Sequence, residues 1–279
     1  MSQPLNALPE VFVSTDDLSS AVSRALAQGE LRQLGPRLYT KNLTDPPEAI
    51  VRRHLWTIIA AYAPDALIAD RTALENAPAP DGSVFVVSER RRDIKLPGLW
   101  IRPRQGPGPL EEDRLFIGGL RLSSQARAYL DNMAPSRRRG GAASRTLSRE
   151  ELEVRLDDMI RRTGAVSANR LRDEARRIAP LIHREEEFSA FEKLLGALLG
   201  TREDELLTDR ARARRTGQPY DPERIALFER LHHDLRSTAL PTRAAMQRDA
   251  EAQASLTFFE AYFSNFIEGT EFDVGEAAD

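Results

Sequence analysis

The sequence contains no cysteine and only four histidines among its 279 residues. The absence of cysteine excludes disulfide bonds and thiolate zinc sites, and it is typical of proteins from a reducing compartment. No apolar run reaches the ~20 residues that a membrane-spanning helix requires. The first residues, Met1-Ser2-Gln3-Pro4, lack the charged and apolar regions of a signal peptide. We therefore expect a cytoplasmic protein that does not enter a membrane.

Charge is distributed unevenly along the chain, although the net charge is only −3. Residues 1–145 contain 20 Lys and Arg against 16 Asp and Glu, whereas residues 146–279 contain 20 against 27. The positive excess of the first half is a mild indication of an anionic partner. The length predicts about two domains, and an apolar fraction of 41% is sufficient to form their cores.

The first 45 residues have the pattern of a winged helix-turn-helix. Polar residues typical of helix N-termini occupy positions 14–17. Apolar residues then recur at helical spacing from Leu18 to Leu26, and Gly29 ends the predicted helix. Two short strands follow at 30–34 and 37–40, joined by a tight turn at Gly35-Pro36. A helix followed by a short hairpin is the arrangement of a recognition helix and a wing.

The segment LAQGELRQLGPRLYT, residues 26–40, resembles the winged helix of AbiEi-type antitoxins and related regulators, although the helices that usually precede the recognition helix are not evident. The resemblance implies that the helix enters the major groove of operator DNA. The residues expected to contact DNA are Ser19, Ser20, Ser23 and Arg24 on the helix, and Arg32, Arg37 and Lys41 on the wing. The alternative is a winged helix that docks a protein instead.

Residues 46–135 are predicted to form a small α/β module. A helix is expected at 48–62, a strand leading into a helix at 65–74, strands at 83–87 and 94–101, a hairpin at 115–122, and a helix after Ser123-Ser124. This order is similar to the second domain of the AbiEi-type regulators, which works beside a nucleotidyltransferase toxin. The run Arg90-Arg91-Arg92 either binds phosphate or an acidic partner, or forms a solvated hairpin tip. Asp70, Arg71 and Glu75 do not make a metal site, because nothing supplies the remaining ligands.

The rest of the chain is predicted to be helical, which gives an α+β N-terminal half and an all-α C-terminal half. Residues 136–146 form a basic, glycine-containing linker that either adds phosphate contacts or is only solvated. The helical region 147–220 is expected to contain helices at 147–163, 167–178 and 185–199, followed by a polar connection at 201–220. In residues 221–279 a helix is expected from Pro222 to Leu235, and the last helix from about Thr242.

The last predicted helix ends in a distinctive pattern. Aromatic residues at 258, 259, 262, 263 and 266 recur at helical spacing, so one face should be buried. Ser264 and Glu268 are four residues apart and share a different face, and Gly269 is suited to a C-terminal cap. A glutamate in the last turn opposes the helix dipole. We therefore expect Glu268 to face a cation that is not part of this helix.

The segment FFEAYFSNFIEGTEF resembles the inhibitory helix of Fic-domain proteins, which transfer AMP from ATP to target hydroxyls. That family's motif is Ser or Thr, three residues, Glu, then Gly or Asn, and it matches at Ser264, Glu268 and Gly269. The resemblance implies that Glu268 pairs with an arginine of the catalytic loop and keeps the ATP γ-phosphate out of productive register. It covers only the C-terminal fifth of the chain.

The Fic catalytic loop, His-x-Phe-x-(Asp/Glu)-Gly-Asn-Gly-Arg, is absent from the sequence. We therefore expect no catalytic residue in this chain and no AMP transfer by it alone. ATP and Mg²⁺ would bind only through a Fic core, supplied in cis or in trans. The resulting hypothesis is a regulatory portion of a Fic-type AMP-transferase, with operator DNA as a further partner. The alternative is a stand-alone AbiEi-like antitoxin and autorepressor. Homo-oligomerisation is open on either hypothesis.

Overall fold

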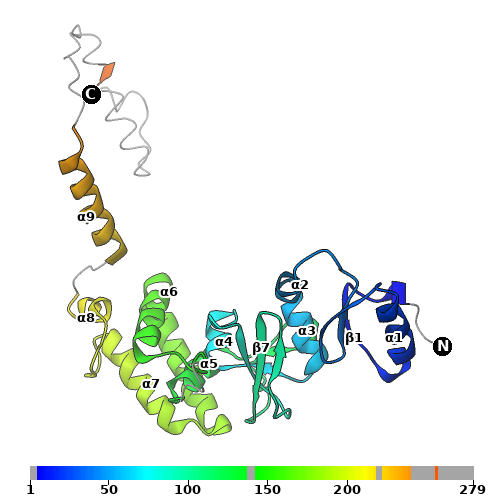
Figure 1. The fold of residues 1–279 in the computed structure, drawn as a ribbon. Coiled ribbons are helices and arrows are strands. Elements are labelled where there is room, and N and C mark those ends of the chain that lie inside the picture. Colours follow the sequence, from blue (N-terminus) through cyan, green and yellow to red (C-terminus); the bar gives the residue numbers. More distant parts are fainter. Residues whose placement is uncertain (1–4, 137–141, 218–221, 240–254, 257–279) are drawn as a thin grey trace. The chain divides into compact units, whose positions relative to one another are not determined.

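The computed structural model describes residues 5–136, 142–217, 222–239 and 255–256 (Figure 1). The chain divides into two compact units, residues 1–221 and residues 222–279, which are described separately. Within the first unit, a mixed α/β region with two sheets is followed by a mainly helical part. The expected fold class, α+β followed by α, is confirmed.

The N-terminal sheet has three antiparallel strands in the order β1-β3-β2. They are β1 (Val11–Val13), β2 (Arg32–Gly35) and β3 (Leu38–Thr40). Helix α1 (Ser19–Ala27) follows a 3₁₀ turn at Asp16–Leu18 and packs on a small apolar cluster that includes Phe12, Val22 and Leu31. The helix and the hairpin lie where the sequence predicts them. Strand β1 adds a third strand, and α1 is the one α-helix described between residues 5 and 45.

The second sheet has six strands in the order β6-β7-β5-β4-β9-β8. The pairs β5–β7 and β4–β9 are parallel, and the other neighbouring pairs are antiparallel. The strands are β4 (Leu67–Ile68), β5 (Ser83–Val87), β6 (Ile94–Leu96), β7 (Leu99–Arg104), β8 (Arg114–Leu115) and β9 (Arg121–Leu122). The single strand predicted at 94–101 is therefore divided into β6 and β7 by a turn at Pro97-Gly98.

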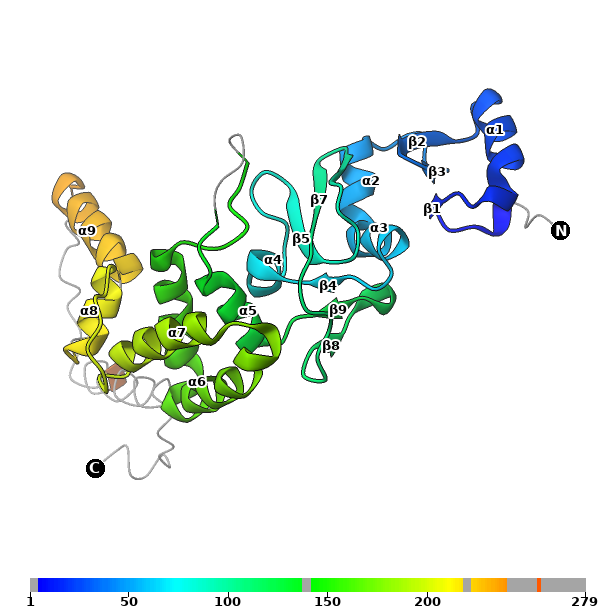
Figure 2. The same ribbon diagram turned by 90° about the horizontal axis from the view of Figure 1, so that it is seen from below.

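Helices cover both faces of this sheet, as Figure 2 shows. Along β5, Val84 and Val86 join the core that contains residues of α2 (Pro47–Arg53) and α3 (Leu55–Tyr62). The alternate residues of β5 point to the opposite face, where α4 (Asp70–Glu75) and α5 (Gln125–Met133) lie. The single helix predicted at 48–62 is wrong in one respect. It is divided at His54, which has the non-helical angles φ −104° and ψ 18°.

The N-terminal sheet and the α/β module share one apolar core. Val11, Leu34 and Leu38 belong to the same buried cluster as Ile50 and Ile59. The Tyr62 hydroxyl donates a 2.6 Å hydrogen bond to the Pro36 carbonyl oxygen. A methyl group at Gly35 would collide with the Leu96 side chain of β6, so glycine permits this close approach.

The helical part contains α6 (Arg149–Ile178), α7 (Glu185–Leu198) and α8 (Asp209–Arg215). A capping box at Ser148 and Glu151 begins α6. Gly164, with φ 78° and ψ 172°, interrupts α6, so the two helices predicted on either side of it are confirmed. Helix α8 was not predicted, because residues 201–220 carry many arginines and little apolar periodicity. Phe191 and Leu194 of α7 pack with Tyr129 and Leu130 of α5 in one core.

The second unit contains α9 (Pro222–Ser237), in agreement with the helix expected from Pro222 to Leu235. The helix expected from Thr242 and the pattern at Ser264, Glu268 and Gly269 lie outside the described residues. No helix in the described part of the chain is long and apolar enough to cross a membrane.

Candidate functional site

The helix residues proposed to contact DNA lie at the surface. Ser19, Ser20, Ser23 and Arg24 of α1 are all exposed, whereas Val22 and Ala25 face the core. Two carboxylates, Asp16 and Asp17, precede the helix and are exposed as well. The face that α1 presents to solvent is therefore polar but carries little positive charge.

The three cations proposed for the wing are bound within the protein. Arg32 donates from Nη1 to the Asp45 carbonyl oxygen at 2.9 Å and from Nη2 to the Leu43 carbonyl. Arg37 donates from Nε to the Ser14 carbonyl oxygen at 2.8 Å and pairs with Asp16 at 2.9 Å. Lys41 Nζ donates to the Leu8 carbonyl oxygen at 2.6 Å. These side chains tie the loops around the small sheet together.

Two further groups were considered in the sequence, the run Arg90-Arg91-Arg92 and the pattern at Ser264, Glu268 and Gly269. The structure describes only the first of them. Arg90, Arg91 and Arg92 are exposed in the connection between β5 and β6, and Arg90 Nη2 donates to the Tyr62 carbonyl oxygen at 3.1 Å. The positions Ser264, Glu268 and Gly269 fall in the part of the chain that the structure leaves undescribed.

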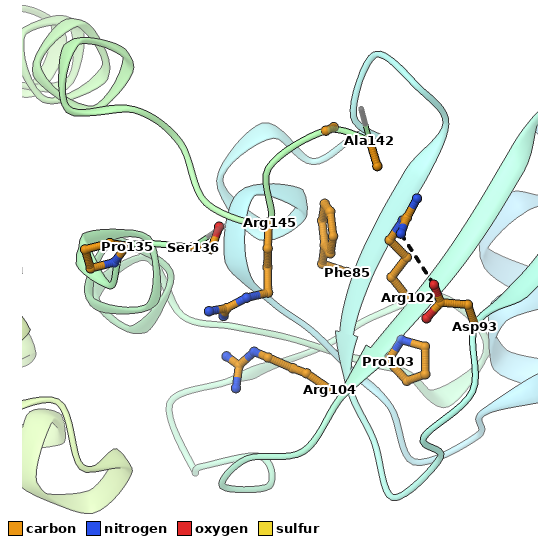
Figure 3. Close-up of a pocket in the computed structure, with 10 residues that line it drawn as sticks. Phe85, Asp93, Arg102, Pro103, Arg104, Pro135, Ser136, Ala142 and Arg145 are labelled. Atoms are coloured by element: carbon orange, nitrogen blue, oxygen red, sulfur yellow. Dashed lines mark hydrogen bonds and ion pairs between the residues drawn. The ribbon is translucent and has the colours of Figure 1, made fainter. Parts of the chain in front are cut away.

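A cavity of about 530 Å³ lies beside the second sheet, and arginine side chains line it (Figure 3). Its lining combines three arginines, one aspartate, apolar rings and small residues. The lining residues are Phe85, Asp93, Arg102, Pro103, Arg104, Pro135, Ser136, Ala142, Ala143 and Arg145. In Figure 3, the guanidinium groups of Arg104 and Arg145 lie close together, and the Phe85 ring stands between Arg145 and Arg102.

Local structure explains how β5 and β7 supply one wall of this cavity. Residues two apart on a strand point to the same face, so Arg102 and Arg104 of β7 project together. In the parallel pairing of β5 with β7, Phe85 is in register with Arg102 and Val87 with Arg104. Arg145 completes the wall from a segment that follows α5, 41 residues beyond Arg104 in the chain.

Asp70 holds two of these arginines in place. Its Oδ2 accepts a 2.8 Å hydrogen bond from Arg104 Nε, and its Oδ1 accepts from Arg104 Nη2 at 3.2 Å and from Arg145 Nη1 at 2.7 Å. The Asp70 side chain is fully buried, and its φ of 53° lies in the left-handed region. Aspartate tolerates that region better than most residues, and strained positions of this kind concentrate at functional sites.

Behind the wall, further ion pairs connect the sheet to the helices. Asp131 of α5 accepts from Arg104 Nη2 at 3.0 Å and lies 3.5 Å from Arg184 Nε. Burial raises the pKa of Asp131, because the charged form is poorly solvated there, while the facing Arg104 acts in the opposite direction. Arg127 and Asp113 form a fully buried pair at 2.8 Å. Breaking such pairs would leave a buried charge uncompensated.

Arg102 occupies the other end of the wall and is held less tightly. Its Nε donates to Ser83 Oγ at 2.7 Å, and its Nη1 lies 3.4 Å from Asp93 Oδ2. The guanidinium also stacks over the Trp100 ring, 4.6 Å from its centroid. These contacts fix the plane of the guanidinium while part of it faces the cavity.

This site was not predicted from the sequence. The strand predicted at 94–101 ends before Arg102 and Arg104, and Arg145 falls in the linker predicted at 136–146, for which phosphate contacts are one alternative. One available signal was the pair of arginines at alternate positions of a strand end. At Asp70, two arginines use the carboxylate oxygens. Among the described residues, no group of three His, Asp or Glu is arranged to hold a metal ion.

Comparisons of this chain with protein-family models, with curated proteins and with solved structures find no match.

Proposed function

We propose that this chain is the regulatory portion of a Fic-type AMP-transferase and that it is not itself catalytic. The observation that supports this proposal is the pattern Ser264-x-x-x-Glu268-Gly269, directly after a run of aromatic residues at helical spacing. Glu268 meets an arginine of the catalytic loop and excludes the ATP γ-phosphate from productive register. Ser264 fixes the helix by a hydrogen bond, and Gly269 lets the chain turn away.

The described fold is consistent with a regulatory role for the region before the motif. Its buried carboxylates are engaged by arginines: Asp70 by Arg104 and Arg145, and Asp131 by Arg104. Both oxygens of Asp70 and one oxygen of Asp131 accept from arginine, so these carboxylates serve to position cations. This arrangement supports a sensing or docking module better than an acid–base centre.

The proposal is tested by joining this chain to a Fic catalytic core and measuring transfer of labelled AMP to target protein. We expect Glu268→Gly to raise transfer about tenfold or more, because one charge-assisted contact is worth roughly 1.5–3 kcal/mol. Glu260→Gly is the matched control, since it makes the same change in the same predicted helix outside the motif. Equal transfer by wild type and Glu268→Gly would refute the proposal.

A second candidate function is operator binding, as in a stand-alone antitoxin and autorepressor. The observation that favours it is the exposed polar face of α1, with Ser19, Ser20, Ser23 and Arg24, beside a three-stranded antiparallel sheet. A salt-titrated gel shift with the DNA upstream of the protein's own coding sequence tests it. Retardation that weakens with salt is expected, and its absence at low salt would remove this candidate.

A further inference from the structure

We propose that the arginine-lined cavity binds a small phosphate monoester, with Arg102 and Arg145 contacting the phosphoryl oxygens. The site lies within the first unit and is independent of Glu268, so this proposal goes beyond the regulatory function and can fail without affecting it.

The cavity lining itself carries more positive than negative charge, which favours an anionic ligand. Three guanidinium groups face the cavity against one carboxylate, that of Asp93, which leaves two positive charges. Behind the wall, Asp70 pairs with both Arg104 and Arg145, and Asp131 pairs with Arg104, so these carboxylates offset part of the positive charge. Asp81 lies farther from the cavity arginines, with its Oδ2 3.9 Å from Arg102 Nη2.

Hydrogen-bond donors remain available on this wall. Arg145 uses Nη1 to reach Asp70, and its Nε and Nη2 have no partner among the residues that the structure describes. Among the residues that the structure describes, Arg102 Nη2 has only the long ion pair with Asp81 as a partner. Guanidinium groups present paired N–H donors whose fork matches two phosphate oxygens, which makes arginine suited to this ligand.

The site is preorganised and enclosed enough to favour a small molecule. The contacts of Arg104 with Asp70 and of Arg102 with Ser83 and Trp100 hold two guanidiniums in position before binding, which lowers the entropic cost of binding. Phe85, Pro103 and Pro135 add apolar surface, which strengthens charge interactions in the cavity. A volume of about 530 Å³ is typical of small-ligand sites, and leaves room for an organic group beside the phosphate.

The test is isothermal titration calorimetry on the full chain with inorganic phosphate, ribose 5-phosphate and ribose. We expect both phosphates to bind and neutral ribose not to bind. Arg145→Gln should weaken binding of ribose 5-phosphate about tenfold or more, and Arg145→Lys less. Arg161→Gln is the matched control, because it removes the same charge from the exposed Arg161–Asp158 pair on α6 and should leave affinity unchanged.

Each outcome decides the proposal. Tighter binding of ribose 5-phosphate than of inorganic phosphate supports an organic ester as ligand, and equal binding supports recognition of the phosphoryl group alone. Binding of ribose as tightly as ribose 5-phosphate would overturn the proposal, as would no binding of either phosphate at millimolar concentration. Unchanged affinity in Arg145→Gln, with a native circular dichroism spectrum, would overturn it as well. Arg102→Gln, on the other end of the wall, provides a second variant should Arg145→Gln fail to fold.

Discussion

Two sets of three basic residues in this protein have different hydrogen-bond partners. Arg32, Arg37 and Lys41 surround the N-terminal sheet, and each donates to a backbone carbonyl oxygen of a neighbouring loop. Arg102, Arg104 and Arg145 are held mainly by carboxylates and serine, and all three line a cavity. The first set has its donors directed into the protein, whereas Arg102 and Arg145 of the second set retain donors that face the cavity.

The difference shows that positive charge in a sequence does not by itself identify an anion-binding surface. A cation that donates hydrogen bonds to carbonyl oxygens holds loops together, and its removal mainly lowers the stability of the fold. A cation positioned by a carboxylate from behind is already fixed in direction, and its outer face is free for a ligand. Variants that separate these two roles therefore test the comparison directly.

The largest effect is expected from Asp70→Ala. This change leaves Arg104 and Arg145 without their common partner, and loss of one member of a buried pair costs roughly 3–5 kcal/mol. Urea unfolding followed by tryptophan fluorescence measures it, because Trp56 and Trp100 both lie in the α/β module. Asp70→Asn, which keeps an amide oxygen and tolerates a positive φ, should lose less. Wild-type stability in Asp70→Ala would show that Asp70 does not organise the wall.

The next effect is expected from Arg32→Ala in the N-terminal sheet. The change removes the charged donors that bind the Asp45 and Leu43 carbonyl oxygens. Because Arg32 is only half-buried, we expect a loss of about 1–2 kcal/mol in the free energy of unfolding. Denaturant unfolding followed by circular dichroism provides the measurement. A variant with unchanged stability but lost DNA binding would reverse the role assigned to Arg32.

A smaller, pH-dependent effect is expected from Asp81→Asn. Burial raises the pKa of Asp81, but backbone hydrogen bonds from Ala143 and Ser83 outweigh it and leave the pKa below its ordinary value of 3.8. The carboxylate therefore stabilises the fold above about pH 4, and this contribution is lost as the pH falls through the lowered pKa.

Asp81→Asn should cost under about 1 kcal/mol at pH 7, where the charged form is present, and progressively less under acid conditions. Urea midpoints of both proteins at pH 7 and at pH 3 give the comparison. The Ala143 contact anchors the segment that carries Arg145, so phosphate binding at pH 7 should weaken in parallel. A stability difference that grows in acid would contradict the assignment.

The smallest change in stability is expected from Arg24→Ala on the exposed face of α1. Substitutions at such surface positions usually alter the free energy of unfolding by less than about 0.5 kcal/mol. Denaturant unfolding therefore provides the control for Arg32→Ala, since both variants lose an arginine from the same region. If the N-terminal region binds operator DNA, Arg24→Ala should weaken the gel shift without this loss of stability. A destabilisation equal to that of Arg32→Ala would mean that Arg24 contributes to the packing of α1 and is not only a surface residue.

Much of the fold could be predicted from the sequence because local patterns determine it. Strand β5 coincides with the strand predicted at 83–87, and α9 corresponds to the helix predicted from Pro222 to Leu235. Helix α8 could not be predicted in this way, because its arginines are stabilised by long-range partners. Arg210, for example, pairs with Asp157, 53 residues earlier in the chain.

The candidate site was harder to predict for the same reason. Asp70 is separated from Arg104 by 34 residues and from Arg145 by 75. No spacing rule for helices or strands connects positions so far apart. The alternation of Arg102 and Arg104 predicts a shared face but not what that face meets. The reach of Arg145 back to Asp70 follows only from the packing of α4 and α5 against the sheet.

Gly164 affects where this chain can accept insertions and deletions in its sequence. In an uninterrupted helix, insertion of one residue rotates every later side chain by about 100° and moves the buried face into solvent. At Gly164, with φ 78° and ψ 172°, the two segments of α6 instead meet at a non-helical residue. A Cβ at this position would have nothing within 4 Å. The glycine thus makes the turn between the segments a place where length changes are tolerated, while Leu156 and Leu171 keep their separate places in the core.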